Sequence, residues 1–461
     1  RDLVRSRGLG DVYKRQVGGL MYRRKTKQHS LPGPDDVYRQ TLPNGITLLV
    51  RENFASSAVV VNGYVEVGEE DEALPREGLT GTIPKLHGLA GFVTDVIERG
   101  TQRRPFEQLY EEIESIGAHF GLNAGTHITS FGAKGLAEYL PLLLDIISDT
   151  LRNPAFHLDQ VEKARAEILT SLKERENDTQ RMASLLFREL VYPETHPYHW
   201  SLLGYPDTIA NITRDDLVQF HQRYFSPQGL TLVVVGGIKV EQAVQAITEK
   251  FGDWQSTRPE RAPLPGVAAL AERREQHITL ADKTQSNLVL GWPGPARLDD
   301  DFIPCYIGNT VLGIFGLYGR LGKSVREANG LAYYAYSQLD GGKGPGPWRI
   351  IAGVNPRNVE KATRIIQQEV RRMRDELIPE DELNDSKSFL TGSLPLQLET
   401  NEGVARSLVN IERYDLGLDY LYRYNDIIMN VTTKQIQAAV QRWMDPEHFA
   451  LAVAEPPAES E

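Results

Sequence analysis

The side chains with which this chain could hold a metal ion are chiefly its histidines. The chain has ten of them, and no two stand four residues apart, the spacing that places two imidazoles on one face of a helix. We therefore expect His87, His119, His127, His196 and His199 to make structural hydrogen bonds in loops or at the surface. The alternative is that some of these histidines together bind a zinc ion.

A second candidate for zinc chemistry is the stretch Gly-Leu-Ala-Gly-Phe-Val-Thr-Asp-Val-Ile-Glu-Arg-Gly-Thr at residues 88–101. It keeps the frame of a helix bearing the inverted H-x-x-E-H motif. In that motif two imidazoles hold zinc and a carboxylate takes a proton from zinc-bound water. Here Gly91 replaces the first histidine, Thr94 the glutamate and Asp95 the second histidine. Because glycine offers no ligand and threonine is no base near neutral pH, this helix cannot run the reaction alone.

Composition narrows the class of protein. The chain of 461 residues is too long for one ordinary core, so we expect at least two domains. Its net charge of −11 argues against general nucleic-acid binding. Its one cysteine, Cys305, excludes an intrachain disulfide and a cysteine-based zinc cluster. We expect it to be a small buried hydrophobe, with a catalytic thiol as the alternative.

The ends of the chain say little about its location in the cell. The first 16 residues resemble translated sequencing adapter and are left out of the fold prediction, so the natural start is either lost or at Met21. No window approaches 18 continuous apolar residues, and we expect no membrane span. The compartment stays open between cytoplasm and periplasm.

The elements that must position the candidate residues alternate along the chain. Residues 41–50 are expected to form strand, Asn-Gly turn and strand, and residues 58–67 and 230–235 are expected to form further strands. Helical spacing covers residues 106–116, 136–151 and 158–188. The acidic stretch Glu66 to Glu72 is expected to be a solvated turn, with a binding role as the alternative. This alternation predicts an α+β fold of mixed, mainly antiparallel sheets packed with helices.

The two halves of the chain resemble each other. A constant offset of 219 residues relates residues 212–234 to residues 431–453, including Thr213 to Thr432 and Pro227 to Pro446. Both threonines are expected to cap an amphipathic helix that leads through a proline turn into a buried strand. We therefore predict an internal duplication. The predicted parts are residues 1–37 (disordered or artefactual), 38–255 (first domain), 256–270 (linker) and 271–457 (second domain).

From about residue 38 onward the chain resembles the insulinase-like (pitrilysin, M16) metallopeptidases. It is similar above all to the non-catalytic subunit of the mitochondrial processing peptidase type and to bacterial relatives of that subunit. The resemblance is carried, in this order, by residues 42–45 (Leu-Pro-Asn-Gly), 88–101, 196–198 (His-Pro-Tyr) with Gly204, 212–227, 233–236 and 326–333. It implies two homologous domains of the LuxS/MPP-like metallohydrolase fold and a pair of subunits that closes around an extended peptide.

The resemblance also implies roles for particular residues. Ser171 stands where the family has its third zinc ligand, although a register error would bring Glu167 or Glu174 there. Arg326 and Tyr333 match the family's Arg…Tyr element, whose guanidinium and phenol can stabilise an oxyanion. A surface charge and a core aromatic residue are the alternative, and Tyr334 is the candidate if the register slips by one.

Glycines at every third position, Gly313, Gly316, Gly319 and Gly322, match the family's substrate-capturing glycine-rich loop. They are not a phosphate loop, because no Gly-Lys-Ser/Thr ending follows a strand. A simple irregular connection is the alternative.

Together these features predict a zinc-less subunit that binds no cofactor itself and pairs with a zinc-bearing M16 subunit as a heterodimer. It would help bind and orient extended peptides for cleavage by the partner. The alternatives are a structural protein of the same fold, like the core subunits of a respiratory complex, and a peptide-binding module without proteolysis.

Overall fold

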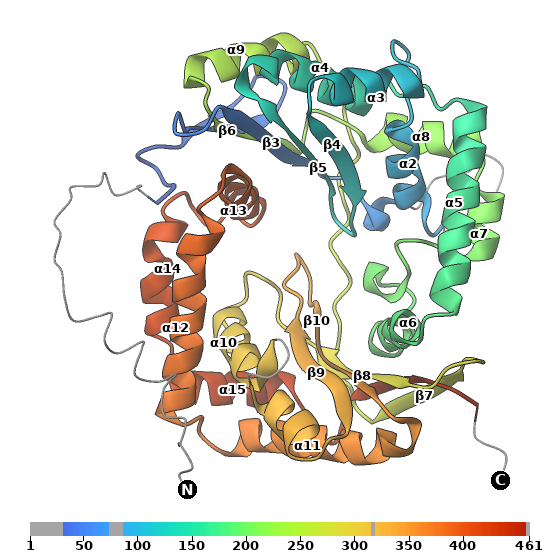
Figure 1. The fold of residues 1–461 in the computed structure, drawn as a ribbon, viewed down its shortest axis with the longest axis vertical. Coiled ribbons are helices and arrows are strands. Elements are labelled where there is room, and N and C mark those ends of the chain that lie inside the picture. The colour runs from blue at the N-terminus through green and yellow to red at the C-terminus, as the bar shows by residue number, and fades with distance from the viewer. Residues whose placement is uncertain (1–30, 73–85, 315–318, 458–461) are drawn as a thin grey trace, which may run out of the picture. The chain divides into compact units, whose positions relative to one another are not determined.

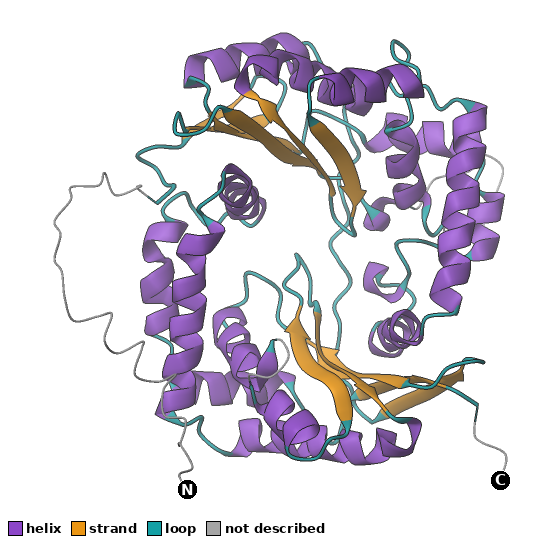
Figure 2. Cartoon of the chain, in the orientation of Figure 1, coloured by secondary structure: helices purple, strands orange, loops and turns teal. Residues whose placement is uncertain are grey.

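The computed structural model describes residues 31–72, 86–314 and 319–457. The strands of this part form two mixed sheets, each packed with helices, so the fold is α+β as predicted (Figure 1). Colouring by secondary structure separates the two sheets from the helices that cover them (Figure 2). None of the helices in the described ranges is long and apolar enough to cross a membrane.

The first sheet has the strand order β1-β2-β6-β3-β5-β4. Strand β2 runs parallel to β6, whereas the other neighbours are antiparallel. Gly45, with φ of +95°, makes the predicted Asn-Gly turn that joins β1 to β2. The strands are β1 (Tyr38–Thr41), β2 (Thr47–Glu52), β3 (Ala58–Val65), β4 (His119–Ala124), β5 (Thr129–Leu136) and β6 (Leu230–Gly236).

The second sheet has the order β7-β11-β8-β10-β9. Strand β7 is parallel to β11, and the rest are antiparallel. Apart from β1, this is the topology of the first sheet, as an internal duplication requires. The strands are β7 (Arg274–Thr279), β8 (Ser286–Pro293), β9 (Ala332–Leu339), β10 (Pro347–Val354) and β11 (Ala450–Glu455).

The helices fall into two groups along the chain. The first group is α2 (Leu89–Ile97), α3 (Phe106–Ser115), α4 (Leu140–Arg152), α5 (Leu158–Glu176), α6 (Thr179–Val191), α7 (Pro206–Asn211), α8 (Arg214–Tyr224) and α9 (Val240–Phe251). The second group is α10 (Phe302–Gly313), α11 (Val359–Asp375), α12 (Glu380–Gln397), α13 (Asn401–Arg413), α14 (Tyr420–Met429) and α15 (Thr433–Trp443). Short turns of other helix types are η1 (Glu69–Asp71), η2 (Ala137–Tyr139), η3 (Pro197–His199), η4 (Gly322–Glu327) and η5 (Pro356–Asn358).

The helix caps confirm the predicted repeat. Thr213 caps α8 in a capping box with Asp216, and Thr432 caps α15 in a capping box with Gln435. Each helix is followed by an interior strand of a sheet, β6 after α8 and β11 after α15, and the two helices begin and end at equivalent positions of the two halves.

One helix from each half covers the sheet of the other half. Helix α6 packs on β11, β8 and β7, and helix α13 packs on β6 and β3. Side chains from α13, including Val404 and Leu408, form one core cluster with Val233 and Val235 of β6. Because the alternate side chains of β6 enter the main core of the first half, both faces of this strand are buried.

The prediction of continuous helical spacing over residues 158–188 misses a break. The structure ends α5 at Glu176 and starts α6 at Thr179. Asp178 causes the new start, because its carboxylate accepts hydrogen bonds from the backbone N–H groups of Gln180 at 2.9 Å and Arg181 at 3.0 Å. The break lets α6 leave the first half and reach the second sheet.

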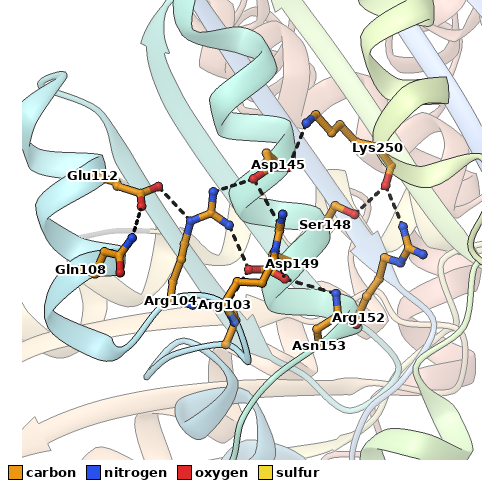
Figure 3. A network of polar contacts seen from close by, with 11 residues as sticks. Arg103, Arg104, Gln108, Glu112, Asp145, Ser148, Asp149, Arg152, Asn153 and Lys250 are labelled. Carbon is orange, nitrogen blue, oxygen red and sulfur yellow. Dashed lines mark hydrogen bonds and ion pairs between the residues drawn. The ribbon is translucent and has the colours of Figure 1, made fainter.

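An ion-pair network fixes the turn that follows α2 (Figure 3). Arg104 binds Asp149 at 2.9 Å and Glu112 at 2.8 Å and also contacts Asp145, which Lys250 of α9 binds at 2.9 Å. The network therefore ties residues 100–105 to α3, α4 and α9. Burial of Asp145 opposes its charge, but hydrogen bonds from Lys250 and Arg104 lower its pKa to about 2.

Candidate functional site

Helix α2 carries three of the four positions at which the resemblance places zinc-site residues. Its N-terminus is anchored by Glu72, whose carboxylate accepts hydrogen bonds from the N–H groups of Gly88 at 3.1 Å and Ala90 at 3.0 Å. Gly88 has φ of +93°, and a Cβ there would lie 2.8 Å from the Cα of Gly204. This close backbone contact sets the direction of the helix against the loop that contains Gly204.

The side chains at the three positions do not fit zinc. A Cβ at Gly91 would lie 3.0 Å from the carbonyl oxygen of Leu202, so the loop of Gly204 fills the space beside the helix. The hydroxyl of Thr94 is buried and donates a hydrogen bond of 2.9 Å to the carbonyl of Ala90. Asp95 alone offers an anionic ligand, and one ligand is too few for a zinc site.

The fourth position, Ser171, lies half-buried on α5, the helix that packs against α2. Glu167, one turn earlier, pairs with Arg99 after the end of α2, and Glu174 is exposed. Within the three described ranges, no three His, Cys, Asp or Glu side chains group in a way that could hold a metal ion. The assignment of these four positions as a former zinc site stays a prediction.

The histidines occupy structural positions. His87 stacks on Trp200 with ring centroids 4.0 Å apart. His127 contacts the Glu70 carboxylate at 3.0 Å and the Tyr198 hydroxyl at 2.7 Å. His196 is fully buried, and its Nδ1 accepts the backbone N–H of Tyr198 at 3.0 Å. These contacts give His87, His127 and His196 structural roles through hydrogen bonds and stacking.

The expectation of a solvated acidic turn is wrong. Glu69, Asp71 and Glu72 are all buried. Arg261, in the linker, pairs with Asp71 with Nε to Oδ1 at 3.0 Å, and it also contacts Glu70. The acidic residues therefore fasten the linker to the first half, a role the sequence hides because the arginine lies far along the chain.

A carboxylate of α2's last turn reaches the edge of the first sheet. Glu98 follows α2 directly and accepts a hydrogen bond from the backbone N–H of Leu122 on β4. Strand β4 is the last strand of its sheet, so its outer N–H groups are open to another partner. Glu98 thus covers part of the edge that a further strand would use.

Burial, together with neighbouring carboxylates, raises the pKa of two acids at this edge, Glu98 and Asp95. Burial raises the pKa of Glu98 to about 7, and the nearby charge of Asp95 adds to the rise. Asp95 is an exposed residue, but burial of its carboxyl group raises its pKa to about 6, with Arg99 opposing the rise and Glu167 adding to it. Sequence reasoning missed Glu98, because its partner Leu122 lies on a strand 24 residues away.

Arg326 and Tyr333 lie at neighbouring element ends in the second half. Arg326 is in η4, a single π-helical turn of the kind often found at functional sites. No described carboxylate forms an ion pair with it. Tyr333 is 69% exposed. In the β9–β10 pairing Gly353 faces Tyr334 and Val354 faces Ala332, so Tyr333 is the extra residue of a β-bulge.

Unlike the exposed Tyr333, Tyr334 is hydrogen-bonded within the protein. Its hydroxyl donates to Asn287 of β8, whose amide donates to Thr179 at the start of α6 at 2.5 Å. Burial raises the pKa of Tyr334 to about 12. Tyr334 therefore links the second sheet to α6, and the bulge leaves Tyr333 as the residue that faces solvent.

The glycine-rich segment is partly described. Gly313 (φ +133°) ends α10, Gly319 (φ +105°) follows, and Gly322 begins η4. A Cβ at Gly319 would lie 2.5 Å from the Cα of Gly313, so the two backbones touch at the base of the segment. Gly316 lies outside the described residues. The close contact explains two of the glycines by sterics alone.

Fold and sequence together define the class of protein. Residues 82–195 match the family model "Insulinase (Peptidase family M16)", and residues 211–390 match "Peptidase M16 inactive domain". The chain therefore belongs to the insulinase (M16) peptidase family. It is an M16-like protein with no zinc-binding group in the part of the chain that the structure describes.

Relatives support this assignment. The chain is 24% identical over 427 residues to the uncharacterized zinc protease YmxG of Bacillus subtilis, covering 91% of this chain and 98% of that protein. It is 26% identical over 373 residues to an uncharacterized zinc protease of Streptomyces coelicolor, covering 80% and 78%. A probable mitochondrial-processing peptidase subunit beta of Arabidopsis thaliana is 24% identical over 274 residues, covering 59% and 50%.

Solved structures share the fold. The crystal structure of a peptidase M16 inactive domain from Pseudomonas fluorescens superposes with a TM-score of 0.83 at 20% identity, covering 92% of this chain and 99% of that one. A protease from Helicobacter pylori gives a TM-score of 0.82 at 18% identity, covering 93% and 100%.

Proposed function

We propose that this chain is the zinc-less subunit of a heteromeric M16 peptidase and helps to bind and orient extended peptides for a zinc-bearing partner. The observation that carries the proposal is a contrast between two places. The α2 positions offer a single candidate ligand, Asp95, whereas Arg326 and Tyr333 are placed at a π-helical turn and a bulge, with Tyr333 exposed to solvent.

The peptide would add to the edge of β4. An extended peptide that pairs with an edge strand gains backbone hydrogen bonds along its length. A cavity of about 330 Å³ lies over the face that β3, β5 and β4 form, between these strands and Arg406 of α13. To pair with the N–H of Leu122, a peptide carbonyl would replace the carboxylate of Glu98.

Arg326 and Tyr333 would act on the peptide bond being cleaved. A guanidinium and a phenol are hydrogen-bond donors that can stabilise the negative oxygen formed in the transition state. Donation of these hydrogen bonds by Arg326 and Tyr333 requires no metal ion in this chain. Zinc chemistry is assigned to the partner alone.

The test begins with the isolated chain and a zinc-bearing M16 chain from the same organism. We expect no bound zinc and no peptide cleavage from the isolated chain, and cleavage by a co-purifying complex. Within the complex, Arg326→Ala and Tyr333→Phe are each expected to lower kcat about 100-fold. Tyr334→Phe and Arg371→Ala, at a neighbouring tyrosine and an exposed arginine paired with Glu447, serve as controls.

Three outcomes contradict the proposal in different ways. Zinc-dependent cleavage by the isolated chain would contradict the zinc-less assignment. Unchanged turnover in both variants would remove the role of Arg326 and Tyr333. A chain that finds no M16 partner at all would be the structural or peptide-binding protein of the same fold.

A further inference from the structure

A cavity in the second half, away from the residues discussed above, combines one guanidinium with several phenols. It has a volume of about 250 Å³ and lies between α10, α12, α13 and α14. Its polar lining consists of Arg297, three tyrosines (Tyr306, Tyr420 and Tyr424), the hydroxyl of Ser407 and two amide side chains, and residues such as Ile303, Ile411 and Leu421 supply an apolar wall. None of the residues that line it is Asp or Glu.

Arg297 is half-buried and held in place. Its backbone N–H donates to the carbonyl of Gly342 at 2.9 Å, and its Nη2 donates to the hydroxyl of Tyr420 at 3.0 Å. Its guanidinium lies 4.6 Å from the ring centre of Phe302 and 5.7 Å from that of Tyr420. No described carboxylate lies within ion-pair distance of it. A buried or half-buried charge usually has a counter-charge, and this one has only aromatic rings and a hydroxyl.

The phenols around Arg297 add hydrogen-bond donors. Tyr420 accepts from Arg297, so its own proton is free to point toward the cavity. Tyr306 and Tyr424 are also half-buried, and burial raises the pKa of both, so they stay protonated donors at any physiological pH. A positive guanidinium with neutral O–H donors and no acid beside it favours an anion.

We propose that this cavity binds a carboxylate carried on an aromatic or apolar body of about amino-acid size. The carboxylate would pair with Arg297 and accept from the tyrosine hydroxyls, while the body packs on the apolar wall. The volume lies just below the roughly 300–1,000 Å³ of drug-sized sites, which sets the size of the ligand. Because Arg297 is already fixed by its contacts, little ordering is needed on binding. The ligand is either a free small molecule or the last residue of a peptide.

The experiment is calorimetric titration of the full chain with matched probes. N-acetyl-phenylalanine carries the carboxylate, and N-acetyl-phenylalanine amide is its neutral counterpart. A short peptide ending in phenylalanine, with a free or an amidated C-terminus, tests the second source of the same chemistry. We expect binding of the free carboxylates and at least about tenfold weaker binding of the amides, because a hydrogen bond to a charged group contributes about 1.5–3 kcal/mol.

Variants locate the binding at the cavity. Arg297→Gln is expected to weaken binding of N-acetyl-phenylalanine about tenfold or more, and Tyr424→Phe, which keeps its ring, by about threefold to tenfold. Arg371→Gln, an exposed arginine on α11, should bind like the wild type. Equal binding of acid and amide, or unchanged affinity in both Arg297→Gln and Tyr424→Phe, would overturn the proposal. If Arg297→Gln unfolds, Tyr424→Phe and the acid–amide comparison still decide.

Discussion

At the residue scale, Glu98 shows how a side chain outside the H-x-x-E-H positions can occupy the edge of the first sheet. It lies one residue after α2, and its carboxylate accepts the edge N–H of Leu122 on β4. A carboxylate that accepts from a backbone N–H normally has a lowered pKa, but here burial and the neighbouring Asp95 outweigh that bond. The protonated form is therefore favoured in the folded chain below about pH 7, where a free glutamate would already be ionised.

Glu98→Gln is expected to make the chain more stable at pH 8. The pKa of Glu98 rises from 4.5 to about 7 on folding, so the unfolded chain loses its proton first, and stability falls as the pH rises from about 4.5 to 7. Glutamine keeps the acceptor and removes the titration, which should add about 2 kcal/mol at pH 8 and nothing at pH 4. Urea unfolding at both pH values measures the difference. A variant less stable at pH 8 than the wild type would refute the assigned protonation state.

Individual residues also show which parts of the candidate site can be predicted from the sequence and which cannot. The resemblance predicts the four positions Gly91, Thr94, Asp95 and Ser171, and the motif frame that carries it along α2 can be read directly from the sequence. The contact of Leu202 with Gly91 and that of Glu98 with Leu122 join residues on separate elements. No periodicity encodes such pairs, and only the fold brings them together.

At the element scale, strands and caps were predictable because their signals are local. The Asn-Gly turn, the threonine caps of α8 and α15 and the buried strand β6 all lie where the sequence places them. The break at Asp178 had a signal too, since Asn-Asp-Thr is an N-cap pattern. No sequence signal indicated which sheet α6 covers, because an amphipathic helix shows that it has an apolar face but does not identify the element that packs on it.

The network that holds the turn after α2 gives a prediction for acid stability. Asp145→Asn removes one of the three partners of Arg104 and the partner of Lys250, and we expect a loss of about 1–2 kcal/mol at pH 7. Because folding lowers the pKa of Asp145 from 3.8 to about 2, this contribution is complete above pH 4 and fades as the pH falls toward 2. Denaturant unfolding from pH 7 to pH 2.5 should show the two curves converging.

The matched control is Asp253→Asn, which breaks the ion pair of Arg152 with a 77% exposed carboxylate. Exposed pairs of this kind contribute at most about 1 kcal/mol. An Asp145→Asn variant no more sensitive than this control would mean that the network does not stabilise the turn.

At the scale of the whole molecule, the domain boundary in the sequence differs from the division by contact, because α6 and α13 each pack on the sheet of the other half. The sequence divides the chain at residues 256–270, whereas α6 belongs by contact to the second sheet and α13 to the first. Each helix buries several apolar side chains, and burying one such side chain contributes about 1.5–3 kcal/mol. The linker itself is pinned by Arg261 to buried acids of the first half.

These contacts predict that cutting the linker does not separate the halves. A protease site inserted between Ala268 and Ala269, which are exposed, would yield fragments that still exchange α6 and α13. We expect the cleaved chain to elute at its original size in gel filtration and to unfold in a single transition. Adding Leu408→Asp, which places a charge in the fully buried face of α13, should let the fragments part. Fragments that part without that substitution would show that the exchanged helices do not hold the halves together. The packing of α6 and α13 matters for the proposed function, because two halves held together in this way would present one preassembled surface to a partner subunit.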